Sequence, residues 1–399
     1  MLKHILQKLE DPKRPLLGPN VRALRFWGLL LPDNVWRKYF YILMHILVTV
    51  FTATECIDVW YVKSDINLLL NNLKITMLAT VSVVNIIEYV TRADLYQRTT
   101  DDRKKIDIIK AFTKYCRKIT YLYWSLMYTT VIIVMAQPIF KYFSSETYRQ
   151  NARNGTEPYL QVVSSWVPFD KNNIVGYLAA SAYQSYAAIY GGGWITSFDT
   201  NAMVIMVFFR AELELLRRDC REIFGTESMP IHDVITMKKL KDCHRRHVDF
   251  VKYARVFDSC LSPIMLLYVF VCSVMLCVTA YQITAKTSPM QRFLTTEYLV
   301  FGVAQLFIYC WHSNDVLVAS QDVMRGPYES AWFARDVRYR KDLYILIGQL
   351  NKNVVFSAGP FSKLTVATFI NYKTCIPGNY YALLTRVIDI DALMWCIAD

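Results

Sequence analysis

The sequence predicts an all-α membrane protein with seven transmembrane helices, an inside N-terminus and an outside C-terminus. Two observations predict this class. Of the 399 residues, 54% are hydrophobic, and they occur in unbroken runs rather than in the amphipathic periods of soluble helices. Most of the 45 Lys and Arg residues lie in four segments between those runs, and short segments rich in Lys and Arg stay on the cytoplasmic side.

The four basic segments predict the orientation of the chain. They are Lys3 to Lys38, Arg92 to Lys118, Arg210 to Arg255 and Arg325 to Lys352. Two apolar stretches separate each basic segment from the next, so all four lie on one side and an odd number of spans places the C-terminus outside. The net charge of +12 is therefore a topology signal and not evidence of a nucleic-acid partner, because acids are interleaved with the basic residues.

Seven stretches are candidate spans. Ile119 to Phe140 and Ser259 to Ala285 contain no charged residue, and each exceeds the roughly 20 residues needed to cross the hydrocarbon core. The other five are short or carry an internal charge, and they are Tyr39 to Thr54, Ile75 to Val90, Asn173 to Phe209, Tyr298 to Asn314 and Leu364 to Thr385. Within the fourth span, we expect Asp199 to reach the inner membrane interface.

The spans divide the chain into five parts. We expect a cytoplasmic arm at 1–38, six helices at 39–318, a cytoplasmic loop with an amphipathic helix at 319–360, a last helix at 361–387 and an extracellular tail at 388–399. Helical spacing of apolar residues also predicts cytoplasmic extensions of the fourth and fifth helices, with a break from Gly225 to Pro230. The helix from Trp332 to Val355 packs on other cytoplasmic helices or rests on lipid headgroups, and Gly359-Pro360 ends it.

Polar motifs outside the spans indicate neither an enzyme nor a metal site. His244 and His247 are three residues apart, but no carboxylate stands at ligand spacing, and we expect them on a solvated helix face.

The glycine run at 191–193 lies inside the fourth span, where it predicts close helix approach or a local break. Asn154-Gly155-Thr156 is a glycosylation sequon, and it falls in the loop between the third and fourth spans, which the charge pattern places outside.

Short motifs in the last 240 or so residues resemble those of the insect odorant receptors. They have the order and spacing of that family, and they are Ser165–Asp170 before the fourth span, Phe307–Trp311 in the sixth span, Arg340–Leu343 in the amphipathic helix and Tyr380–Leu384 in the last span. The first 150 residues are similar to the family only in layout. The Thr-Tyr and Gln-Phe motifs that mark gustatory receptors are missing from the last span.

The resemblance implies a tetrameric, ligand-gated, nonselective cation channel in the plasma membrane of olfactory sensory neurons. The chain is too short for the large cytoplasmic insertion of the family's co-receptor, so the resemblance implies an odorant-specific tuning subunit that assembles with that co-receptor. Alternatives are a gustatory-receptor-like channel and a G-protein-coupled receptor, which has the opposite orientation. A secondary transporter is a further class, but the halves of the chain show no repeat.

The last span carries the expected gate. Tyr372, Ile376, Asn379, Leu383 and Arg386 share one helix face, and its mixture of polar and apolar groups indicates an aqueous path. Four copies of Leu383 can close such a path by dewetting, with Asn379 and the neighbouring Ala382 beside it. The charge of Arg386 is either offset by the two aspartates that follow or held at the lipid interface.

An odorant arriving from outside is expected to bind among the outer halves of the helices. By analogy with the family, the pocket lies between the second, third, fourth and sixth spans. Aromatic and Met side chains there suit a small hydrophobic ligand, although such residues are also ordinary packing material. The candidates are Met77, Val81, Tyr128, Ile132, Met135, Tyr183, Tyr186, Tyr298 and Phe301.

Overall fold

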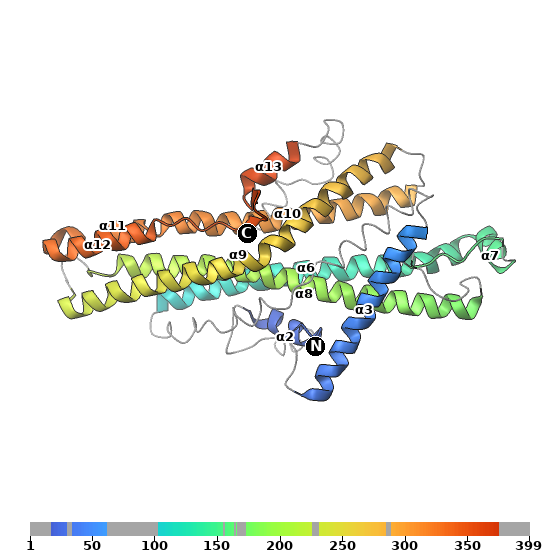
Figure 1. The fold of residues 1–399 in the computed structure, drawn as a ribbon, viewed down its shortest axis with the longest axis horizontal. Coiled ribbons are helices and arrows are strands. Elements are labelled where there is room, and N and C mark those ends of the chain that lie inside the picture. The colour runs from blue at the N-terminus through green and yellow to red at the C-terminus, as the bar shows by residue number, and fades with distance from the viewer. Residues whose placement is uncertain are drawn as a thin grey trace.

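The computed structural model describes residues 17–29, 34–61, 103–154, 156–162, 165, 173–225, 231–284 and 289–374. This part of the chain is almost entirely helical, which confirms the predicted class. Figure 1 shows an elongated bundle in which four long helices, α6, α8, α9 and α10, follow the long axis. The second candidate span and the second half of the seventh lie outside the described residues.

The helices coincide with the predicted spans and extend beyond them. They are α2 (Gly18–Phe26), α3 (Val35–Tyr61), α6 (Arg103–Ser144), α7 (Glu146–Arg153), α8 (Ile174–Arg221), α9 (Asp233–Thr284), α10 (Pro289–Asp322), α11 (Arg325–Tyr328), the 3-10 turn η2 (Trp332–Ala334), α12 (Val337–Leu350) and α13 (Val366–Thr374). Two described stretches, Ile106–Ser144 and Asp233–Phe270, are long and apolar enough to cross a membrane by length and composition. Helix α8 carries more polar residues, many of which the bundle buries.

Side-chain contacts give the relative directions of the long helices. Asp199 of α8 contacts Gln305 of α10, and Arg210, further along α8, pairs with Asp315, further along α10. Helices α8 and α10 are therefore parallel. Contacts of α8 with α3, α6 and α9 run in the opposite order. For example, Phe209 contacts Phe257 of α9, whereas Glu212, which is further along α8, contacts Arg246, which is earlier in α9. These directions are the ones that consecutive membrane crossings require.

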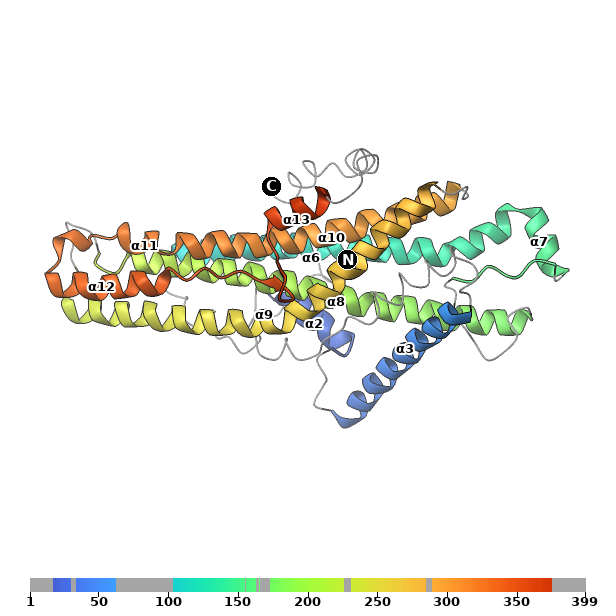
Figure 2. The same cartoon turned by 45° about the horizontal axis from the view of Figure 1, so that its top comes forward.

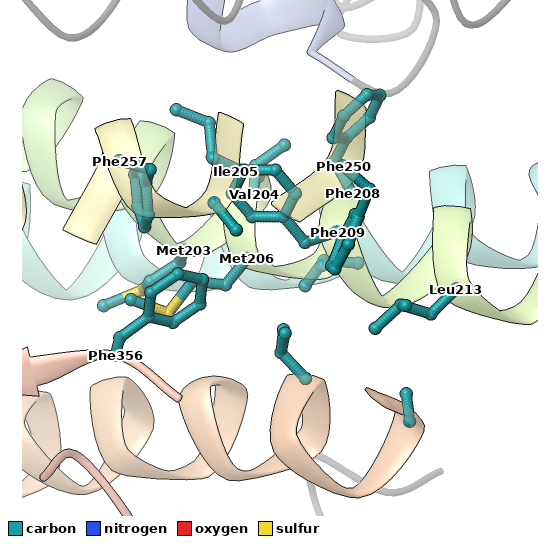
Figure 3. Close-up of a cluster of buried hydrophobic side chains, with 14 of the residues drawn as sticks. Met203, Val204, Ile205, Met206, Phe208, Phe209, Leu213, Phe250, Phe257 and Phe356 are labelled. Carbon is teal, nitrogen blue, oxygen red and sulfur yellow. The ribbon is translucent and has the colours of Figure 1, made fainter. Parts of the chain in front are cut away.

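The core lies where α8, α9 and the segment after α12 meet. Phe209 of α8 is at its centre, with its ring centroid 5.6 Å from those of Phe250 and Phe257 on α9. Phe356 closes the cluster at 5.9 Å from Phe209, as Figure 3 shows. Because every residue from Ala202 to Phe209 is buried, α8 is surrounded on all sides here and serves as the central helix of the fold.

One end of the bundle is charged. Here α8 forms ion pairs with both α9 and α10, and Figure 2 shows α12 lying along α9 at the same end. Arg246 of α9 binds Glu212 of α8, with Nη2 2.9 Å from Oε1, and also pairs with Asp219. Arg217 of α8 binds Glu329 after α11 at 2.8 Å. Helices α8 and α9 extend past the predicted fourth and fifth spans, as the apolar spacing predicted.

His247 corrects the expectation of a solvated histidine face. His244 is exposed, but His247 is 2% exposed and its ring stacks on that of Phe250. Burial, with the nearby positive charges of Lys352 and His244, lowers the pKa of His247 to about 4. A spacing of three residues places His247 300° around the helix from His244. Only the neighbours of His247 in the tertiary structure decide that this direction is inward.

A two-stranded hairpin, which no pattern in the sequence predicts, precedes α13. Strands β1 (Ser357–Ala358) and β2 (Ser362–Lys363) pair antiparallel around Gly359, whose φ of 66° favours glycine. Asp258 of α9 accepts a 2.7 Å hydrogen bond from the amide of Ser357, and Ser262 accepts one of 2.9 Å from the amide of Gly359. The predicted break at Gly359-Pro360 is thus a turn anchored to α9.

Replacing Arg246 by Gln is expected to destabilise the charged end by about 3–5 kcal/mol, because two acids would lose their shared cation and Glu212 is buried. The adjacent Arg245→Gln is a matched control, since the side chain of Arg245 is 63% exposed and pairs with that of Asp242, which is 44% exposed. We expect it to cost less than about 1 kcal/mol. Thermal unfolding of the purified protein measures both, and equal losses would show that the buried network adds no stability.

Candidate functional site

Three helices meet around one buried carboxylate. Asp199 of α8 accepts hydrogen bonds from Tyr123 of α6 at 2.8 Å and from Gln305 and Tyr309 of α10 at 2.6 and 2.9 Å. All four side chains are at most 5% exposed. Asp199 is therefore the point at which α6, α8 and α10 are joined. We call these four residues the Asp199 cluster.

The expectation that Asp199 reaches the membrane interface was wrong. The carboxylate is 5% exposed and turned toward the two neighbouring helices. A buried charge is tolerated only when hydrogen-bond donors replace the lost water, and the three donors here lie 76, 106 and 110 residues away in the chain. Spacing along the sequence cannot reveal partners at such distances, but Tyr123, Gln305 and Tyr309 were each visible as polar groups in apolar spans.

Helix α10 connects the Asp199 cluster to α13. Gln305 and Tyr309 are four residues apart and lie on one face of α10, whereas Phe307 lies on the opposite face. Phe307 is 3% exposed, and its ring centroid is 5.2 Å from that of Phe369 on α13. Helix α13 begins the predicted last span. A single helix thus contacts α8 on one face and the start of the predicted last span on the other.

The predicted ligand residues of α6 lie on its accessible side. Tyr128 and Ile132 are exposed and Met135 is partly buried. Tyr128 is five residues from Tyr123, so it stands about 7.5 Å along α6 from the Asp199 cluster. These three residues share one stretch of α6, directly beyond the cluster in the direction of α7.

The predicted ligand residues of α8 face a different helix. The hydroxyl of Tyr183 donates to the carbonyl of Leu47 on α3 at 2.9 Å. The hydroxyl of Tyr186 lies 3.0 Å from Sδ of Met44, also on α3. The structure therefore brings the two tyrosines together against α3 and assigns their hydroxyls to helix packing.

The remaining predicted residues have no described side-chain surroundings. Tyr298 and Phe301 lie on α10. Met77, Val81 and the four gate residues Asn379, Ala382, Leu383 and Arg386 lie outside the described residues. Among the residues that the structure describes, no group of three His, Cys, Asp or Glu side chains is arranged to hold a metal ion.

The segment between α7 and α8 carries the sequon and packs on the end of α8. Asn154 directly follows α7 and is exposed, as a glycosylation acceptor must be. Gln184 of α8 donates a 3.0 Å hydrogen bond to Ser165, so the outer-loop motif contacts the helix that follows it. Tyr177 of α8 also donates to the carbonyl of Leu160.

The glycine run of α8 is a site of close approach, and the helix continues through it. A Cβ on Gly193 would lie 2.2 Å from Cζ2 of Trp27, which follows α2, and one on Gly192 would lie 3.1 Å from Sδ of Met127 on α6. Of the two readings that the sequence left open, close packing is confirmed. The tryptophan ring occupies the place of the missing side chain.

Comparison with known proteins identifies the family. The family model for the 7tm odorant receptors matches residues 37–374. Odorant receptor Or2 of Anopheles gambiae is 25% identical over 41% of this chain and 44% of its own length. Odorant receptor 13a of Drosophila melanogaster is 21% identical over 64% of this chain and 65% of its own, so these alignments span less than two thirds of either relative. Odorant receptor 30a of the same fly is 20% identical over 96% of this chain and 99% of its own.

Solved structures share the fold. The olfactory receptor OR5 of Machilis hrabei, solved alone and in complex with eugenol, matches 94% of this chain with TM-scores of 0.76 and 0.75 at 16% identity. The matches cover 98% and 99% of the OR5 chains. The odorant receptor coreceptor of Anopheles gambiae is 23% identical over 39% of this chain and 32% of its own length.

The fold is thus that of a seven-helix membrane receptor. The chain belongs to the insect odorant receptor family, and the family resemblance of its sequence motifs is confirmed.

Replacing Gly193 by Ala is expected to cost about 1–3 kcal/mol of stability, because the new methyl group would overlap the ring of Trp27. Gly191→Ala is the matched control, since its Cβ would meet only Val48, at 3.9 Å. That variant should be neutral or gain up to about 1 kcal/mol, because Ala is the better helix former. Thermal unfolding midpoints of the two purified variants measure this difference in stability. The prediction is wrong if Gly193→Ala is as stable as Gly191→Ala.

Proposed function

We propose that this protein is the odorant-binding subunit of a ligand-gated, nonselective cation channel. The observation that carries the proposal is the position of α10, which joins the Asp199 cluster on one face and contacts α13 through Phe307 and Phe369 on the other. A ligand that displaces α10 relative to α6 and α8 therefore acts directly on the first turns of the last span. Family membership supports the reception of odorants.

The proposed ligand site lies between the outer halves of the second, third, fourth and sixth spans. The exposed aromatic and aliphatic stretch of α6 supplies one wall, and α8 and α10 supply the others. A small hydrophobic volatile with few hydrogen-bonding groups suits such a surface. The proposed contacts are Met77, Val81, Tyr128, Ile132, Met135, Tyr183, Tyr186, Tyr298 and Phe301.

The proposed gate is in the last span. Leu383 is its closing residue, with Asn379, Ala382 and Arg386 along the same path, and wetting of the apolar ring lets cations pass. The charged end of the bundle is the cytoplasmic side in this proposal. There the extensions of α8, α9 and α10 with α12 form an anchor domain that holds four subunits together.

The proposed partner is the odorant co-receptor, in a hetero-tetramer. This chain is similar to the coreceptor of Anopheles gambiae over about a third of that protein. The assembled channel is proposed to lie in the plasma membrane of olfactory sensory neurons.

The proposal predicts an inward cation current when the protein is expressed with the co-receptor and a panel of small hydrophobic volatiles is applied. The current should not need G proteins, because ligand and gate belong to one assembly, so a blocker of G-protein signalling serves as the control. Whole-cell recording measures it. The channel proposal fails if no volatile evokes current in cells whose surface expression of the protein is confirmed.

Replacing Leu383 by Ala is expected to raise the current in the absence of ligand, because a narrower side chain no longer excludes water from the pore. Leu384→Ala is the matched control: it makes the same change 100° around the helix. Leak current per surface channel, measured before odorant is applied, distinguishes the two. Equal leak in both variants would remove Leu383 from the gate.

A further inference from the structure

We infer that the Asp199 cluster is the element that couples ligand binding to the last span, with Asp199 as a positioning residue for gating. The inference rests on the proposed channel function and deepens it. In the described part of the chain, the side-chain hydrogen bonds of Asp199 are to Tyr123, Gln305 and Tyr309, none of which is a proposed ligand residue. Its role is to hold α10 against α6 and α8, so that a displacement in the ligand site is delivered to α13.

The junction of α6, α8 and α10 at Asp199 is made of strong hydrogen bonds. Hydrogen bonds that a carboxylate accepts are roughly twice as strong as neutral ones, and the three bonds to Asp199 measure 2.6 to 2.9 Å. Both of its oxygens are used, Oδ2 by Tyr123 and Gln305 and Oδ1 by Tyr309. The donors come from both neighbouring helices. A displacement of any one of the three helices at this level therefore also acts on the other two.

The proposed ligand residues of α6 and α10 lie close to the Asp199 cluster along each helix. Tyr128 lies five residues from Tyr123 on α6, and Phe301 lies four residues from Gln305 on α10. Both displacements point away from the charged end, toward the proposed ligand site. Along α6 and α10, the Asp199 cluster consequently lies between the charged end and these proposed ligand residues. A ligand that changes the spacing of these helices must act on the cluster.

Helix α10 connects the Asp199 cluster to α13. Phe307 lies between Gln305 and Tyr309 in sequence and on the opposite face of α10, where it packs on Phe369. Both rings are at most 4% exposed. A packed interior transmits displacement rather than absorbing it. Rotation or translation of α10 at the cluster is therefore passed to Phe369, five residues before the end of the described part of the last span.

The role of Asp199 in positioning the helices differs from simple packing. A buried charge stabilises a fold poorly, since apolar replacements of similar volume are often neutral or stabilising. What a carboxylate with three directed donors does provide is a defined orientation of three helices. A second ionic contact between α8 and α10, Arg210 with Asp315 at 2.9 Å, lies at the charged end, and its side chains are 35% and 36% exposed. The same two helices therefore offer an internal comparison.

The test is Asp199→Asn in the full channel with the co-receptor, activated by a volatile that evokes current in the wild type. Asn keeps the shape and removes the charge. We expect the maximal ligand-evoked current per surface channel to fall at least about fivefold, the lower range of a coupling free energy. We expect the half-maximal ligand concentration to change less than that, because the ligand contacts remain. Asp315→Asn is the matched control and should keep the wild-type maximum.

Tyr309→Phe provides a second test that does not depend on tolerance of Asp199→Asn. It removes one donor and keeps the ring, and it should lower the maximal current in the same way, though less. Tyr190→Phe is its control, because the Tyr190 hydroxyl donates to the carbonyl of Trp27, on the side of α8 away from α10. If Asp199→Asn does not reach the surface, the Tyr309 and Tyr190 pair decides the question.

A double-mutant cycle tests the path through α10. If Asp199 acts through Phe307 and Phe369, Asp199→Asn combined with Phe369→Leu should lose no more current than the worse single variant. Losses that multiply would place the two residues on separate paths and overturn the inference, as would a wild-type maximum in both Asp199→Asn and Tyr309→Phe. A wild-type channel that answers no volatile refutes the proposed channel function instead.

Discussion

The fold depends on how one carboxylate in an apolar helix finds its hydrogen bonds. Asp199 lies in the middle of α8, where water is excluded, and an unpaired charge there would cost several kcal/mol. Tyr123 approaches from α6, and Gln305 and Tyr309 approach from α10. The need to pair this group sets the rotation of all three helices about their axes. The remaining contacts of the bundle are built around that choice.

Helix α8 has this central role because so many of its residues are buried. Its first half packs on α3 and α6, its middle forms the aromatic core around Phe209, and its last turns enter the ion pairs of the charged end. The absence of side chains at Gly192 and Gly193 brings α6 and the end of α2 close to it. One long helix thereby connects the two ends of the molecule, which lets the outer region and the charged end share a single framework.

The fold was more predictable than the site. Charge-free runs and apolar spacing placed α3, α6, α8, α9 and α10, and the motif around Phe307–Trp311 indicated the family. The same reasoning placed Asp199 at an interface and His247 in solvent, and the structure buries both. The hairpin at Ser357–Ala358 was missed because two-residue strands leave no periodic signal, and Asp258 and Ser262, which anchor it, lie about a hundred residues earlier in the chain.

The sequence by itself determined the helical class, the approximate positions of the long described helices and the family, because hydrophobic runs and short motifs are properties of neighbouring residues. Only the tertiary structure decided which face of each helix is inside. The tyrosines Tyr183 and Tyr186 turn to α3, and Gln305 and Phe307 divide the two faces of α10 between α8 and α13. The physical reason is that hydrogen bonds and ring contacts are satisfied between segments far apart in the chain, and no local pattern records which partner is chosen.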